Sequence, residues 1–225
     1  DDTRDRLIEE CVEEMMADYG NTIFQSSSRN QYRIIRVKRI LKRTVWALQQ
    51  QIRQGEFEPG EFEVSFSMED SLSAINIDLS EHEKMRLRGR IDRVDLCETD
   101  DKVYVKIIDY KTGNTSLDLV ALYYGLQLQL AVYLDAAMEL EQKKHPGKQV
   151  EPAGVFYYHI DDPMLDQEED ETDEAWGRRM LKALRMDGLV NADRKVVELL
   201  DRVLEDGTTS DVIPVGKKKD GSYTS

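Results

Sequence analysis

Hydrophobic residues recur at helical spacing in two stretches near the start of the chain. In residues 3–19 apolar side chains stand four positions apart, which predicts an amphipathic helix. The segment Tyr32–Gln54 follows three serines at 26–28 that can cap a helix, and Gly55 ends it. We therefore expect a helical N-terminal part over residues 1–55.

The pattern then changes to an alternation of apolar and polar residues, which is typical of a strand with one buried face. Glu61–Met68 places four apolar side chains on one face, and Ser73–Leu79 makes a second, shorter strand. The stretch Gly89–Lys111 reads as a hairpin with a polar turn at residues 98–101. These segments predict an antiparallel meander of four consecutive strands.

The turn of this hairpin also predicts which residues stand opposite each other. The expected pairs are Leu96 with Val105, Val94 with Ile107, Asp92 with Asp109, and Arg90 with Lys111. One face therefore runs from apolar pairs to two facing carboxylates and a lysine. The other face sets Asp95 against Lys106, a favourable charge pair that we expect on a wetter surface.

A helix from Leu117 to about Gln142 and an almost wholly apolar strand, Ala153–Ile160, follow the hairpin. Such a strand suits a position buried on both faces, reached by a crossover back into the sheet. The predicted fold class is α/β, with a mixed central β-sheet of an antiparallel meander plus a crossover strand, flanked by helices. Residues 61–160 hold this sheet and its helix.

Two more helices and an edge strand are expected in residues 174–215. One helix runs from about Glu174 to Met186, Asn191 caps the next, and residues 212–215 form a short strand whose return strand we do not expect before Ser225. With no internal repeat and no low-complexity linker, we predict a single domain over residues 1–225.

Charge is distributed unevenly along the chain, so its net value of −14 is a weak guide to partners. Ser28–Gln54 carries eight arginines and lysines and no acid, whereas Asp161–Glu174 carries nine acids and no base. The basic positions fit either a solvated helix face or a contact with the phosphate backbone of DNA. The DNA-binding candidates are Arg36, Lys38, Arg39 and Lys42.

Cysteine usage and hydropathy indicate a reduced, cytoplasmic protein. Cys11 and Cys97 lie far apart and lack metal-type spacing, and no apolar run approaches the roughly 18 residues of a membrane span. The three histidines, His82, His145 and His159, also lack such spacing and are expected to be structural or solvated.

The first candidate for chemistry is the constellation of Asp92, Asp109 and Lys111. Two facing carboxylates on a half-buried face repel each other, and a divalent cation between them removes that cost. Oxygen donors suit Mg²⁺ or Mn²⁺, and a lysine beside the ion can orient or deprotonate a water or neutralise charge on a phosphate. The alternative is an Asp–Lys salt bridge at a strand end.

The second candidate is Gln129 with Tyr133, which fall within an apolar stripe of the helix that follows Lys111. A glutamine in such a stripe needs hydrogen-bond partners, either a neighbouring backbone group or the polar residues at the end of the sheet. We expect Gln129 to be buried and Gln127 to face solvent.

Three motifs together resemble the PD-(D/E)XK nuclease superfamily in its RecB-like branch. They are GRIDRVD (Gly89–Asp95), IIDYKTG (Ile107–Gly113) and YYGLQLQLAVYLDA (Tyr123–Ala136). Within the branch, the similarity is narrowest to the nuclease domains of B subunits of bacterial ATP-dependent helicase–nucleases. It covers most of the chain from about Tyr32 and implies a restriction-endonuclease-like core.

The resemblance also implies roles for the candidate residues. Asp92 and Asp109 would hold Mg²⁺ or Mn²⁺ with the Tyr110 carbonyl, and Lys111 would be the catalytic lysine. Gln129 and Tyr133 would support that lysine and the DNA strand. The implied reaction is metal-dependent hydrolysis of DNA phosphodiester bonds, in an enzyme that processes double-strand breaks for recombinational repair with a helicase–nuclease A subunit as partner.

Two features of the branch are missing from the sequence. Its members carry a further His or Glu metal ligand upstream of the sheet, and their B subunits carry a 4Fe–4S cluster held by cysteines that neither Cys11 nor Cys97 matches. We therefore expect a fragment that is truncated at both ends. The alternative function is a non-catalytic DNA-binding or subunit-docking module that retains the nuclease fold.

Overall fold

The computed structural model describes residues 2–18, 27–66, 75–78, 84–87, 89–166 and 170–224. The chain divides into two compact units. The first comprises Asp1–Gln51 and Ile160–Leu184, and the second Ile52–His159 and Arg185–Ser225. The single domain over residues 1–225 stays a prediction.

The first unit is helical. It contains α1 (Asp2–Asp18), α3 (Ser28–Gln54) and α6 (Asp173–Ala183), which confirms the three helices expected there. Ser27 precedes α3, and its hydroxyl accepts from the Asn30 N–H at 3.3 Å. Thr172 caps α6 by accepting from the Ala175 N–H at 3.2 Å. No helix among the described residues is long and apolar enough to cross a membrane.

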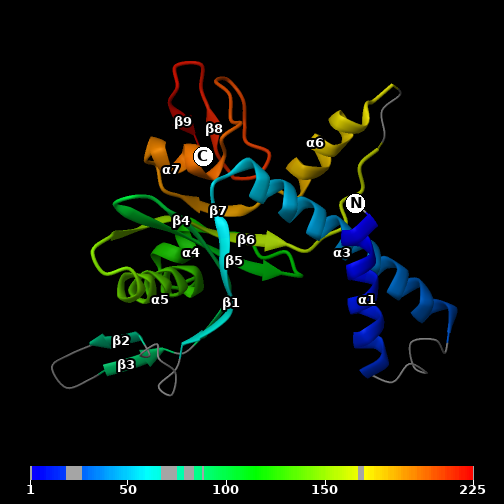
Figure 1. Ribbon diagram of the computed structural model, residues 1–225, viewed down its shortest axis with the longest axis horizontal. Helices are drawn as coiled ribbons and strands as arrows, with labels where there is room; N and C mark the ends of the chain where they lie inside the picture. The colour runs from blue at the N-terminus through cyan, green and yellow to red at the C-terminus, as the bar shows by residue number, and fades with distance from the viewer. Residues whose placement is uncertain are drawn as a thin grey trace. The chain divides into compact units, whose positions relative to one another are not determined.

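A mixed five-stranded sheet forms the second unit (Figure 1). Its strands, in spatial order, are β1 (Glu58–Phe66), β4 (Gly89–Glu98), β5 (Lys102–Lys111), β6 (Gln149–His159) and β7 (Asp187–Val190). Only β5 and β6 pair in parallel, so the predicted crossover strand and the mixed sheet are confirmed. β7 was not predicted and begins just after Met186, the expected end of the preceding helix.

The predicted meander of four consecutive strands is wrong, because the second of them, β2 (Ile75–Asp78), does not join the main sheet. β2 pairs with β3 (Lys84–Leu87) in a separate two-stranded sheet, and β1 pairs directly with β4. The clean alternation predicted for β1 also fails, because Phe62 is 59% exposed while Phe66 is buried. Glu63 between them adopts a positive φ of 54°, which interrupts the strand geometry. Met68 lies outside the described residues.

The predicted hairpin register is confirmed from Glu98 to Arg93. Val94 pairs with Ile107 and Leu96 with Val105, so these side chains share one face of the sheet. This face packs against α5 (Gln129–Lys144), which contacts β4, β5 and β6 (Figure 1). The resulting core contains Val94, Val105, Ile107, Leu130, Ala137, Val155 and Tyr157.

The single helix predicted from Leu117 to Gln142 is two helices. α4 (Leu119–Tyr123) is capped by the Asp118 side chain, and α5 begins only at Gln129. Gly125 between them has a φ of +75°, a conformation that favours glycine and interrupts a helix. The break leaves Leu126 79% exposed, although the expected apolar stripe included it.

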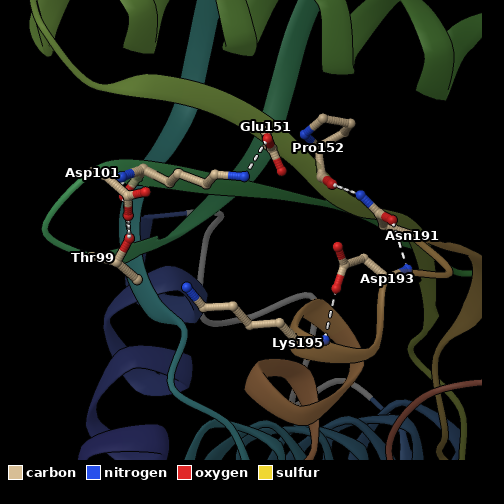
Figure 2. A network of polar contacts seen from close by, with 8 residues as sticks. Thr99, Asp101, Glu151, Pro152, Asn191, Asp193 and Lys195 are labelled. Carbon is tan, nitrogen blue, oxygen red and sulfur yellow. Dashed lines mark hydrogen bonds and ion pairs between the residues drawn. The ribbon is translucent and has the colours of Figure 1, made fainter.

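A polar network joins the ends of β5 and β6 to the start of α7 (Arg194–Leu200) (Figure 2). The Asn191 side chain donates to the Pro152 carbonyl at 2.8 Å and accepts from the Asp193 N–H at 2.9 Å. Asp193 in turn accepts from the Lys195 N–H at 2.8 Å. Asp193 is therefore the helix cap, and the cap predicted at Asn191 is wrong by two residues.

The edge strand predicted at residues 212–215 is wrong. Val212, Ile213 and Val215 are buried in irregular structure, where the Ser210 hydroxyl accepts from two backbone N–H groups. The strand pair lies just beyond, between β8 (Gly216–Lys217) and β9 (Tyr223–Thr224). A return strand is thus present before Ser225, contrary to expectation.

The sheet face opposite α5 buries an ionic cluster of Arg93, Asp95 and Lys106. The Asp95 carboxylate accepts from Arg93 at 2.5 and 2.8 Å and pairs with the Lys106 ammonium at 2.8 Å. Their exposed fractions are 3%, 0% and 5%, so the wetter surface expected for Asp95 and Lys106 is wrong. Burial lowers the pKa of Lys106 against the opposing effect of Asp95.

Removal of Asp95 leaves two buried cations without their shared anion. We expect Asp95→Ala to lower the free energy of unfolding by about 3–5 kcal/mol, as measured by urea denaturation. Asp100→Ala, in the exposed hairpin turn, is the matched control and should stay within about 0.5 kcal/mol of the parent. Equal losses in the two variants would show that the cluster contributes nothing particular to stability.

Gly89 of β4 packs against side chains of β1 and α5. A Cβ atom there would stand 2.5 Å from the buried Phe66 ring and 2.9 Å from the Tyr133 ring. Gly89→Ala should therefore destabilise the protein by about 1–3 kcal/mol. Gly113→Ala is the control, because a Cβ at Gly113 meets no atom within 4 Å. An unchanged urea midpoint for Gly89→Ala would contradict the close packing.

Candidate active site

Five predicted site residues come from three elements of the second unit. Asp92 lies on β4, Asp109 and Lys111 lie near the end of β5, and Gln129 and Tyr133 lie on the first two turns of α5 (Figure 1). Asp109 and Lys111 share the α5 side of the sheet with Val105 and Ile107, because residues two apart on a strand point the same way. The site therefore continues the apolar core at its polar end.

Asp109 is the most deeply buried member, with 3% of its surface exposed. The Lys111 ammonium lies 2.6 Å from the Asp109 Oδ2 atom. Burial raises the pKa of Asp109 above its ordinary value, Lys111 opposes this effect, and the negative charge of Asp92 adds to it. The regular pairing of β4 with β5 ends at Arg93 and Ile108, so Asp92 directly opposite Asp109 stays a prediction.

Gln129 connects Lys111 to Asp109. Its Oε1 atom accepts from the Lys111 ammonium at 3.1 Å, and its amide nitrogen donates to Asp109 Oδ1 at 3.2 Å and to the Tyr133 hydroxyl at 3.0 Å. The structure therefore brings together the four residues Asp109, Lys111, Gln129 and Tyr133.

The expected burial of Gln129 is wrong. Gln129 is exposed because it is the first residue of α5, after the break at Gly125, and not the middle of a continuous helix. Gln127 is not simply solvent-facing: its side chain accepts from the Asp118 N–H at 2.9 Å and donates to the Ser116 carbonyl at 3.0 Å.

Asp92 reaches the site through the backbone of β5. Its Oδ2 atom accepts from the Tyr110 N–H at 2.9 Å, just past Arg93 and Ile108, where the regular pairing of β4 and β5 ends. The Tyr110 side chain points to the other face, where its hydroxyl accepts from Arg93 at 3.4 Å. Asp92 therefore holds the peptide that joins Asp109 to Tyr110.

Tyr157 is a site residue that sequence reasoning missed. It pairs with Asp109 in the parallel register of β5 and β6, and the Lys111 ammonium lies 5.2 Å from the centre of its ring. Burial raises the pKa of Tyr157. The only signal in the sequence was its place in the apolar strand Ala153–Ile160, which gives no register against β5.

The histidines play the structural parts expected of them where they are described. His159 follows Tyr158 at the end of β6, and its Nδ1 atom lies 3.0 Å from the Gly113 carbonyl oxygen. His145 caps the end of α5 beside Glu141. His82 lies outside the described residues.

The donors at the site suit a hard divalent cation that keeps part of its water shell. Among the described residues, no group of three or more His, Cys, Asp or Glu side chains converges on one point. Asp92 and Asp109 supply two carboxylates, and Mg²⁺ commonly binds through one or two carboxylates with several waters. The electrostatic repulsion at Asp109 is the kind that such an ion relieves.

Three of the four predicted DNA-binding residues on α3 pair with acids of the first unit. Lys38 lies 3.1 Å from Glu13 and Lys42 lies 2.6 Å from Glu9, while Arg39 donates to Asp162. Arg36 is exposed. None of these four belongs to the unit that holds Asp109.

Comparison with known proteins gives a family for this arrangement. The family model of the PD-(D/E)XK nuclease superfamily matches residues 1–212. The ATP-dependent helicase/deoxyribonuclease B subunit of Lachnoclostridium phytofermentans is 48% identical over 100% of this chain and 19% of that protein.

The protein of the same name from Alkaliphilus metalliredigens is 43% identical over 96% of the chain and 18% of its own length. The chain thus spans about a fifth of the length of these relatives. The motifs, the mixed sheet and the family match agree, and the resemblance noted in the sequence is confirmed: the chain belongs to the PD-(D/E)XK nuclease superfamily.

Proposed function

We propose that this chain hydrolyses phosphodiester bonds of DNA with the help of Mg²⁺ or Mn²⁺. The observation that carries the proposal is the network in which Lys111 contacts both Asp109 and Gln129 while Asp92 adds a second carboxylate. Membership of a nuclease superfamily supports the reaction class. The contacts among Asp109, Lys111 and Gln129 support these residues as the ones that carry it.

Asp92, Asp109 and the Tyr110 carbonyl are the proposed metal ligands. The bound ion supplies a Lewis acid for the phosphate and lowers the pKa of a coordinated water. Asp92 also accepts from the Tyr110 N–H, so it holds the backbone of the residue whose carbonyl is the third proposed donor. The low exposure of Asp109 favours an ion over bulk water as the partner of its charge.

Lys111 is the proposed catalytic lysine. An ammonium has three N–H donors, and among the described residues Asp109 and Gln129 accept two of them. The third can donate to a phosphate oxygen or to the attacking water, where it stabilises the charge that develops in the transition state. Gln129 and Tyr133 position this lysine, and the Tyr157 ring supports its charge from β6.

The names of the relatives suggest the wider setting. We propose that the chain is the nuclease part of the B subunit of a helicase–nuclease, which works with an A subunit on DNA double-strand breaks for recombinational repair. A 4Fe–4S cluster in such a protein would need cysteines beyond Cys11 and Cys97, since such a cluster takes four cysteine ligands and this chain has two.

Loss of either central residue should abolish metal-dependent cleavage without unfolding the chain. We expect Asp109→Asn and Lys111→Ala to lower the rate of cleavage of single-stranded DNA in MgCl₂ or MnCl₂ by about 10²–10³-fold or more. The assay is best done in the full-length protein and in this chain side by side. Cleavage at the parent rate by either variant contradicts the assignment.

The controls for these two variants match their chemistry at exposed positions of α5. Asp135→Asn removes a carboxylate and Lys143→Ala removes an ammonium that pairs only with Glu139 among the described residues. Both should cut at the parent rate. Circular dichroism of all four variants checks that the fold is retained.

Gln129 should affect catalysis through Lys111 and Asp109. Gln129→Leu removes both contacts, and we expect metal affinity or cleavage rate to fall by about 10–100-fold, as for other groups that orient metal ligands. Titration with Mn²⁺ measures the metal affinity separately from the cleavage rate. A purely structural loss would lower thermal stability and leave that affinity unchanged. Gln142→Leu, at the far end of α5, is the control.

A further inference from the structure

The first unit contains a hollow whose lining combines cations with indole rings. Its volume is about 480 Å³, within the range of about 300–1,000 Å³ for small-molecule sites. The lining residues come from α1, α3 and α6: Arg4, Glu9, Ile35, Lys38, Arg39, Lys42, Arg43, Trp46 and Trp176. Five of these nine residues are cations and one is an acid, in a chain of net charge −14.

The two tryptophans of the lining are the only ones in the chain. Both are partly exposed, and Trp46 lies near α6, since a Cβ on Gly177 would stand 3.8 Å from its ring. An indole is a stacking surface for a planar ring, and guanidinium groups bind phosphates through paired hydrogen bonds. Planar rings joined by phosphates are the chemistry of a nucleic acid strand.

Asp162 occupies the position where such a phosphate would bind. Its carboxylate is 5% exposed and accepts from both Arg39 and Arg43, and Arg43 also donates to the Pro163 carbonyl at 3.2 Å. Two arginines that converge on one anion make a site for two oxygens of a phosphate as well as for a carboxylate.

The two lysines of the hollow have more exposed partners. Lys42 pairs with Glu9 and Lys38 with Glu13, and all four side chains keep 24% or more of their surface exposed. Exposed ion pairs of this kind contribute little to stability, because water screens the charges and holding two long side chains together costs entropy. They can therefore exchange a carboxylate for a phosphate at little cost.

We propose that this hollow binds single-stranded nucleic acid, with a base against Trp46 and Trp176 and a phosphate on Arg39 and Arg43 in place of Asp162. An unpaired strand is required because the faces of stacked, paired bases are not free to contact an indole. Asp162 competes with the strand and so weakens its binding. The site uses no residue of the proposed catalytic network and needs no metal ion.

Tryptophan fluorescence reports on this hollow directly, because both indoles line it. We expect a single-stranded oligothymidylate to quench the emission of the 225-residue chain in excess chelator, in a saturable way. The affinity should fall with salt with a slope of about −1.4 to −2.1, for two or three phosphates at about −0.7 each. Thymidine monophosphate and inorganic phosphate should bind at least tenfold more weakly.

Variants of the anion site separate the proposed contact from overall charge. Asp162→Asn should raise the affinity about threefold or more, whereas Asp166→Asn removes the same charge from the same segment and should leave it within twofold. Replacement of both Arg39 and Arg43 by Gln should weaken binding about tenfold or more. Arg53→Gln, at the far end of α3, is the control for the lost cations.

Three results would overturn the proposal. The first is that the oligonucleotide binds, as measured by anisotropy, without quenching the tryptophans. The second is that Asp162→Asn and Asp166→Asn bind it with equal affinity. The third is that a duplex of the same length binds as tightly as the single strand. Asp135→Asn, at an exposed position of α5 outside both sites, should bind the strand as the parent does. The titration thus tests this site even where the proposed catalysis fails, and a failed titration leaves the cleavage assay unaffected.

Discussion

An ionisable carboxyl with 3% of its surface exposed needs compensation from the protein, and at Asp109 the compensation determines the layout of the site. Lys111 supplies a positive charge from the same strand face, which is possible because it stands two residues further along β5. Gln129 supplies a hydrogen bond to each partner. Gln129 makes both bonds from the first residue of α5, directly after the break that follows α4.

The opposite face of the same two strands carries a second buried charge cluster with another role. Asp95 there accepts from Arg93 and Lys106, and the group is closed off from solvent. Tyr110 connects the two faces, because its N–H binds Asp92 and its hydroxyl accepts from Arg93. A shift of β4 along β5 would disrupt both clusters at once, so the register is fixed by polar groups as well as by the apolar core.

Local patterns predicted the hairpin, the central strands and the grouping of Asp109 with Lys111. Successive side chains of a strand point to opposite faces of the sheet. Once a short turn fixes the register of a hairpin, the face on which each side chain lies is therefore known. The burial of Asp95 and Lys106 was not predictable in this way, because a charged pair usually indicates solvent and the segments that cover this face, α7 among them, lie far along the chain. Tyr157 was missed for a related reason, since a parallel pair formed through a crossover has no turn from which to count its register.

The helix break at Gly125 and the partner of β2 were not predicted, for a different physical reason. Residues Leu117–Gln142 contain few strong breakers, and a single glycine is tolerated in many helices, so the positive φ of Gly125 becomes decisive only with tertiary packing. Likewise β2 has strand propensity, but propensity does not select a partner, and β1 paired with β4 instead.

Ion pairs in this protein fall into two physical classes that have different consequences. The ion pairs of Asp109 and Asp95 are buried, so breaking one leaves an uncompensated charge. These pairs therefore fix the positions of the side chains that form them. Those of Lys38 and Lys42 are exposed and contribute little, so their partners are replaceable. Asp162 lies between the classes: its carboxylate is buried, yet Arg39, which binds it, is half exposed. A buried anion held by accessible cations can be displaced by a stronger anion without loss of the fold, which is the behaviour that a phosphate-binding surface requires.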